Sequence, residues 1–98
     1  MTIEEIKQKD VIYISASWCG PCKVTKPIVE KVNSEIDKDI EIIVMDEVSE
    51  QLATYIKTDL GVRSVPTTIF FKEGVEVFRK VGAYSESELK ILILEHVG

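Results

Sequence analysis

The run Trp18-Cys19-Gly20-Pro21-Cys22 contains the only two cysteines of this 98-residue sequence, and it decides how the chain is interpreted. It stands just after an apolar run and just before a segment with helical periodicity. Cys19 therefore falls at a helix N-terminus, where unpaired backbone N–H groups and the helix dipole favour a thiolate. Cys22 lies one turn inside, as the shielded partner that closes a disulfide. In an intracellular protein, a Cys-x-x-Cys pair beside a strand–helix unit is typical of a redox site.

Other interpretations of the cysteine pair are weaker. A structural zinc site needs four ligands, whereas this sequence offers two cysteines and one distant histidine, His96. A purely structural disulfide would close a very short loop and would constrain the unfolded chain only weakly. Two buried, unreactive cysteines are disfavoured by Gly20-Pro21, because proline in a first helical turn is a starting signal. We therefore expect a catalytic pair, with no metal and no cofactor beyond its own disulfide.

Length and composition indicate a single small domain over residues 1–98. The net charge of −5, with no basic cluster, argues against binding to nucleic acid or to an anionic membrane surface. No stretch approaches the roughly 20 apolar residues of a membrane span, and residues 1–10 lack an apolar export signal. We therefore expect a cytoplasmic protein, in a compartment where thiols are kept reduced.

Apolar spacing and capping signals predict the order helix, strand, helix, strand, helix, strand, strand, helix. The predicted helices are residues 3–9, the segment after Trp18 with Pro27 inside it, a short helix capped by Ser49, and a last helix opened by Ser85-x-x-Glu88. The residues expected to face inward are Val24, Ile28, Val29, Val32 and Ile36 in the second helix, Leu52, Ala53 and Ile56 in the third, and Leu89, Leu92 and Ile93 in the last.

Four predicted strands complete the pattern: Val11–Ser15, Ile40–Met45, Thr67–Phe71 and Val75–Val81. The first two flank a helix, so they should be parallel with a right-handed crossover. The last two are joined by Lys72-Glu73-Gly74 and should form an antiparallel hairpin. The expected fold is of the α/β class, a four-stranded mixed sheet flanked by helices on both faces.

Several motifs at consistent spacing resemble the thioredoxin family over about residues 11–97. They are Trp18-Cys19-Gly20-Pro21-Cys22-Lys23, Pro27 five residues later, Gly61-Val62-Arg63-Ser64-Val65-Pro66-Thr67, Phe70-Phe71-Lys72-Glu73-Gly74 and Val81-Gly82-Ala83. The resemblance implies a thioredoxin-like fold and a protein-disulfide reductase or dithiol electron donor. In it, Cys19 attacks a target disulfide, Cys22 resolves the mixed disulfide, and a thioredoxin reductase regenerates the dithiol. The Gly20-Pro21 pair resembles the reducing members of the family and is expected to set the redox potential of the cysteine pair. Trp18, Tyr13 and Pro66 are expected to tune the active site as well.

The resemblance also implies a binding surface for disulfide-containing protein substrates. The Val65–Pro66 bond should be cis and should lie against the cysteine pair. A target chain should dock on an apolar rim and add its backbone beside Pro66 in the manner of a strand. That rim comprises Trp18, Val65, Pro66, Gly82 and Ala83.

The sequence departs from the family pattern at a paired position. Thioredoxins usually carry a buried Asp six residues before the first active-site cysteine and a Lys partner on the next strand, whereas this chain has Tyr13 and Ile42. The paired loss is physically sensible, because either ion alone would be a buried unpaired charge. In the family the Asp is thought to help move a proton from the second cysteine. Tyr13 or a water would take that task here, unless the step needs no protein base.

The sequence also lacks the N-terminal segment that carries the family's extra first strand. The Ile40–Met45 strand would then lie at an edge of the sheet, where an apolar strand invites pairing with another chain. The expected state is a monomer or a weakly self-associating protein.

Three other functions stay open at this point. A glutaredoxin shares the fold but usually has Cys-Pro-Tyr-Cys, and the Val81-Gly82-Ala83-Tyr84 loop resembles thioredoxin instead. A dedicated electron donor to one enzyme, such as ribonucleotide reductase, is a narrower form of the main interpretation. A non-catalytic subunit could use the same surface only to bind a partner.

Overall fold

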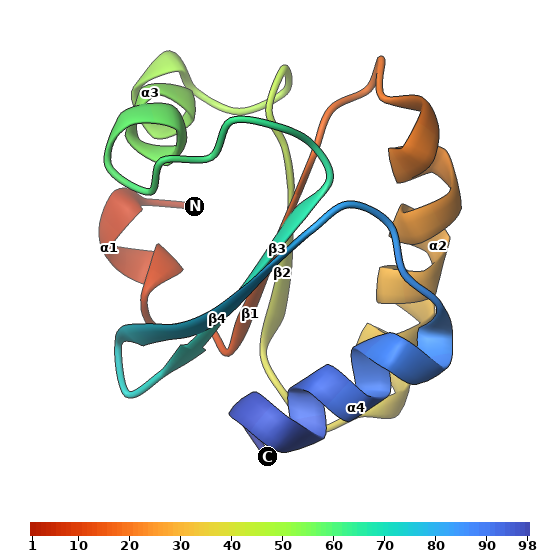
Figure 1. The fold of residues 1–98 in the computed structure, drawn as a ribbon. Coiled ribbons are helices and arrows are strands. Elements are labelled where there is room, and N and C mark those ends of the chain that lie inside the picture. Colours follow the sequence, from red (N-terminus) through yellow and green to blue (C-terminus); the bar gives the residue numbers. More distant parts are fainter.

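The computed structural model describes all 98 residues and contains four helices and four strands (Figure 1). The elements in chain order are α1 (Ile3–Ile6), β1 (Val11–Ser15), α2 (Gly20–Glu35), β2 (Ile40–Val44), α3 (Glu50–Thr58), β3 (Thr67–Lys72), β4 (Val75–Val81) and α4 (Glu86–His96). This order agrees with the predicted one. No helix is long and apolar enough to cross a membrane.

The four strands form one mixed sheet in the order β2-β1-β3-β4. β1 is parallel to β2 and antiparallel to β3, and β3 and β4 form the antiparallel hairpin. α1 and α3 cover one face of the sheet, and α2 and α4 cover the other (Figure 1). β2 lies at an edge, as the sequence predicts.

Alternating side chains of the central strands form an apolar core on each face. Under α2 and α4, Val11 and Tyr13 pack with Phe70. Under α1 and α3, Ile12 and Ile14 pack with their neighbours on the other strands and helices. Because side chains of a strand point alternately to the two faces, β1 supplies both cores and is buried along its whole length.

Local signals place the ends of the elements. Ser49 accepts a hydrogen bond from the backbone of Leu52 at 3.2 Å, and Ser85 accepts one from Glu88 at 3.2 Å, so both serines cap their helices. The β3–β4 turn has positive φ at Glu73 and Gly74, which matches the hairpin expected there.

Two expectations about helices were wrong. The first helix ends at Ile6 and not at residue 9, because Asp10 is already tied to Asp39 through a backbone bond of 2.9 Å and a side-chain bond of 2.8 Å. Val24 of α2 does not face the protein core: it is 65% exposed, and Thr25 is buried instead. Smaller differences are Ala53, which is half-buried, and the strand ends at Val44 and Lys72.

Candidate functional site

The cysteine pair lies at the N-terminus of α2, directly after the turn that follows β1. Cys19 and Cys22 form a disulfide, with their Cα atoms 5.3 Å apart. Cys19 is the N-cap residue, and the backbone N–H of Cys22 points at its Sγ at 3.2 Å. This N–H and the helix dipole would stabilise negative charge on the Cys19 sulfur in the reduced protein. The two cysteines are almost equally buried, so their difference lies in position and not in exposure.

Gly20 and Pro21 form the first helical positions between the cysteines. The carbonyl of Pro21 accepts a 2.9 Å hydrogen bond from the hydroxyl of buried Thr25. This bond links the first turn of α2 to its second turn. A Cβ added at Gly20 would meet nothing within 4 Å, so packing does not require glycine there. The influence of these two residues on the redox pair therefore stays a prediction.

The Val65–Pro66 peptide bond is cis, as the family resemblance implied. The carbonyl oxygen of Val65 lies 3.7 Å from Cys19 Sγ, so this loop lies against the cystine. The N–H of Val65 forms no hydrogen bond within the chain, which leaves it free for a partner's backbone. The Gly82 N–H donates to the Pro66 carbonyl at 2.8 Å, with φ of +96° at Gly82, a conformation that favours glycine.

The predicted rim surrounds the cystine, with unequal exposure. Trp18 is 75% exposed and is the largest apolar side chain on this surface. Ala83 is also exposed, Val65 and Gly82 are half-buried, and Pro66 is buried. The structure thus brings the five residues to one place, and binding of a target there stays a prediction.

Tyr13 lies in the core beneath α2 and not against the cysteines. It is fully buried, whereas the cysteines pack with Ala16 and Val65 in a separate cluster. Its register partner on β2 is Ile42, which confirms that the two positions departing from the family pattern are neighbours. The Tyr13 hydroxyl forms no hydrogen bond of normal geometry, since the nearby Thr25 hydroxyl donates to the Pro21 carbonyl. Burial raises the pKa of the phenol and outweighs the opposing effect of Thr25.

We predict that Tyr13→Phe stabilises the fold by about 1 kcal/mol, because it removes a buried hydroxyl that lacks a partner. Tyr84→Phe is the matched control: the Tyr84 hydroxyl shares a 2.7 Å hydrogen bond with buried Thr68, so its loss should destabilise by about 1–2 kcal/mol. Urea unfolding of the two variants measures both effects. Equal destabilisation by both would contradict the unpartnered state of Tyr13.

The two phenols also predict how stability changes at alkaline pH. Burial raises the pKa of both Tyr13 and Tyr84 above the value of an unfolded tyrosine. The stabilisation that comes from keeping these two phenols buried and neutral is therefore complete below about pH 10. It is lost as pH rises through their folded-state pKa values. Tyr13→Phe should flatten this alkaline loss of stability.

The same variant tests whether Tyr13 has a role in catalysis. If the pH dependence of mixed-disulfide resolution is the same in Tyr13→Phe and native protein, the phenol has no such role.

Sequence reasoning missed two hydrogen bonds that hold the loop before the cystine. Asp46 accepts a 2.9 Å hydrogen bond from the backbone N–H of Ser17 and a second one from the Ser17 hydroxyl. These bonds lower the pKa of Asp46, so its carboxylate stays ionised. The available signal was topological: Asp46 and Ser17 follow the ends of parallel neighbours β2 and β1, and such ends meet at one edge of a sheet. No group of three or more metal-binding side chains is close enough together to hold an ion.

Comparison with known proteins agrees with this geometry. The family model for thioredoxin matches residues 1–95. The chain belongs to the thioredoxin family. It is 36% identical over 86 residues to the thioredoxin of Mycoplasmoides gallisepticum, covering 88% of this chain and 82% of the relative. It is 39% identical over 90 residues to the thioredoxin Asp f 29 of Aspergillus fumigatus, covering 89% and 76%.

Solved structures show the same thioredoxin-like fold. A mutant thioredoxin from Halobacterium salinarum NRC-1 superposes with a TM-score of 0.79 at 32% identity, covering 97% of this chain and 81% of that one. The thioredoxin from Aeropyrum pernix has a TM-score of 0.80 at 25% identity, covering 100% and 85%. With the Cys19–Cys22 pair in place, this thioredoxin-family chain is a protein-disulfide oxidoreductase that acts by thiol–disulfide exchange.

Proposed function

We propose that Cys19 is the attacking thiol, that Cys22 is the resolving thiol, and that the substrates are disulfides of protein targets. The observation that carries this assignment is the place of Cys19 as the N-cap of α2, with the Cys22 N–H on its sulfur at 3.2 Å. A thiolate there attacks at neutral pH, whereas Cys22 lies within the helix. Exposed Trp18 lies directly beside the attacking position.

The reaction proceeds in two exchanges. The Cys19 thiolate attacks one sulfur of the target disulfide, a mixed disulfide forms, and the other target sulfur leaves as a thiolate. The Cys22 thiolate then attacks the Cys19 sulfur and releases the second target thiolate. Two electrons have moved to the target, which takes up two protons, and Cys19–Cys22 is oxidised. No further cofactor is needed for this chemistry.

Substrate docking is proposed on the rim formed by Trp18, Val65, Pro66, Gly82 and Ala83. The free N–H of Val65, beside its carbonyl near the cystine, supports backbone pairing with an extended target segment. The apolar surface of Trp18 supplies contact area next to the reacting sulfur.

The cellular setting is proposed from the family. A thioredoxin reductase would regenerate the dithiol, and the protein would act in the cytoplasm as an electron carrier, with ribonucleotide reductase as one candidate recipient. The β2 edge supports weak self-association, because its outer backbone groups have no neighbouring strand. Sedimentation at rising concentration tests that state, and strictly monomeric behaviour would contradict it.

Trapping of the intermediate tests the assignment of the two thiols. Cys22→Ser should accumulate a mixed disulfide between Cys19 and a target, because the resolving attack is lost while the first exchange remains. Mass spectrometry of the variant with a disulfide-containing protein, before and after added dithiothreitol, identifies the linked cysteine. Cys19→Ser is the control and should form little adduct. A stable adduct on Cys22 of that control would reverse the assignment.

A further inference from the structure

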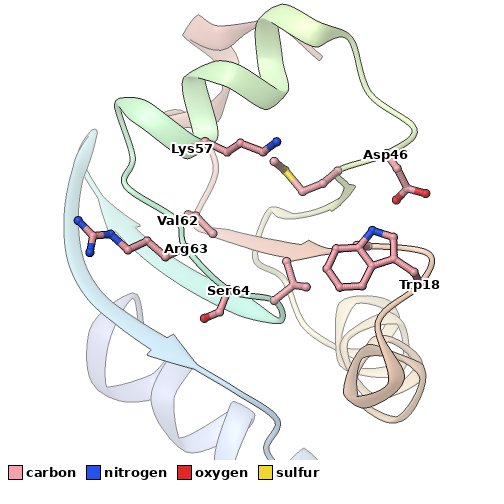
Figure 2. Close-up of a pocket in the computed structure, with 9 residues that line it drawn as sticks. Trp18, Asp46, Lys57, Val62, Arg63 and Ser64 are labelled. Carbon is pink, nitrogen blue, oxygen red and sulfur yellow. The ribbon is translucent and has the colours of Figure 1, made fainter.

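A pocket of about 260 Å³ lies beside the cystine and shares residues with the proposed docking rim (Figure 2). Trp18 and Val65 belong to both, so a target segment bound at the cystine passes the mouth of this pocket. The rest of its apolar lining comes from Ala16, Met45 and Val62, on three different segments of the chain. A target side chain close in sequence to the reacting cysteine would therefore lie at this pocket.

The polar lining of the pocket consists of Lys57, Arg63, Asp46 and Ser64. Lys57 extends from α3 toward the side of the pocket formed by Asp46 and Trp18, whereas Arg63 points away from Trp18 (Figure 2). Neither Lys57 nor Arg63 forms an ion pair or a side-chain hydrogen bond within the chain. Asp46 forms no ion pair with Lys57, and its two oxygens accept the hydrogen bonds from Ser17.

Lys57 and Arg63 are two of several basic residues that form no ion pair. The ion pairs of the chain use basic residues away from the cystine: Lys9, Lys31, Arg79, Lys80 and Lys90. A smaller hollow of about 160 Å³, lined in part by Cys22, also has two unpaired lysines, Lys23 and Lys26. Four of the seven Lys and Arg residues without an ion pair thus line these two hollows, and the other three, Lys7, Lys38 and Lys72, do not.

We propose that the pocket receives an acidic side chain of the target, and that Lys57 makes this chain prefer disulfides with a neighbouring glutamate. The two methylene groups of glutamate suit the apolar lining, and its carboxylate can reach an amine at the pocket wall. The charge pair would raise affinity modestly and would suppress targets that bring a lysine to the same place. This inference rests on the proposed disulfide-reductase function and adds the class of preferred substrate.

Peptide substrates test this preference. A cystine peptide without other charges carries one glutamate at each position near the reacting cysteine in turn, and its partner peptide carries glutamine there. At low salt, native protein should reduce the best glutamate peptide about threefold to fivefold faster in kcat/KM than its glutamine partner. The ratio should fall toward one as salt screens the charge.

Three variants show where the preference arises. Lys57→Gln should remove the glutamate preference and leave reduction of the glutamine peptide unchanged. Arg63→Gln should reduce the preference less, because its side chain points away from Trp18. Lys72→Gln, at the far end of β3 from Pro66, changes the net charge equally and should keep the whole preference.

The outcomes separate this inference from the function on which it rests. If glutamate and glutamine peptides are reduced equally at every position, the pocket inference is wrong and the reductase remains. A preference that survives Lys57→Gln would also overturn it. If native protein reduces neither peptide faster than dithiothreitol alone, the proposed function and the pocket inference fail together.

Discussion

Replacing Cys19 by serine is expected to lower catalysed reduction of insulin disulfides at least about a hundredfold, to the background rate of dithiothreitol. A hydroxyl at the N-cap of α2 would still accept the Cys22 N–H, so the helix should begin normally. The loss would therefore fall on chemistry and not on folding, since a serine oxygen cannot form or exchange a disulfide.

The assay needs a control for the fold and one for the electron source. Circular dichroism and thermal unfolding of Cys19→Ser should be compared with reduced native protein, because the variant cannot form the disulfide. The rate of dithiothreitol alone sets the baseline. If Cys19→Ser retained a large fraction of native turnover, Cys22 would be the attacking thiol, and the assignment made from the N-cap would be wrong.

The sequence predicted the part of the site that is local in the chain. Cys19 to Cys22 lie within one helical turn, so the start of α2 follows from Gly20-Pro21 and the apolar spacing after them. The β3–β4 hairpin followed from the local run Lys72-Glu73-Gly74 for the same reason. The cis bond at Pro66 could be predicted only from the family resemblance. Its surroundings include Cys19 and Gly82, which are far away in sequence.

What the sequence did not predict depends on where side chains point in three dimensions. Val24 fits an apolar stripe by spacing, yet Thr25 takes the buried position beneath Pro21. The contact of Asp46 with Ser17 was not predicted, since only the parallel register of β1 and β2 brings the two residues together. The Lys57 pocket likewise requires α3 to be placed beside the cystine, which no local pattern shows.

The paired departure at Tyr13 and Ile42 predicts the largest change in stability. Tyr13→Asp is expected to lower the free energy of unfolding by about 3–5 kcal/mol at neutral pH, because it introduces an unpaired carboxylate at a fully buried position. Ile42→Lys alone should cost less, since Ile42 is half-buried on the edge strand β2 and a lysine there can extend its amine toward water.

The double variant Tyr13→Asp with Ile42→Lys should recover part of the loss, because the two residues are register partners and both pack against the same core. We expect a favourable coupling energy of about 0.5–3 kcal/mol in a double-mutant cycle measured by urea unfolding. Tyr13→Asn is the control for lost volume: it removes the ring as Tyr13→Asp does, but adds no charge.

The pH dependence of these variants separates charge from packing. Burial should raise the folded-state pKa of the introduced carboxyl above its unfolded value of about 3.9, so Tyr13→Asp should be most stable in acid and should lose stability as pH rises above about 4. The lysine in the double variant lowers that folded-state pKa and should flatten this loss, whereas Tyr13→Asn should show none of it. If Tyr13→Asp and Tyr13→Asn were equally unstable at pH 4 and pH 7, charge burial would not be the cost. The replacement of the family's Asp and Lys by Tyr13 and Ile42 would then depend on side-chain volume and not on charge.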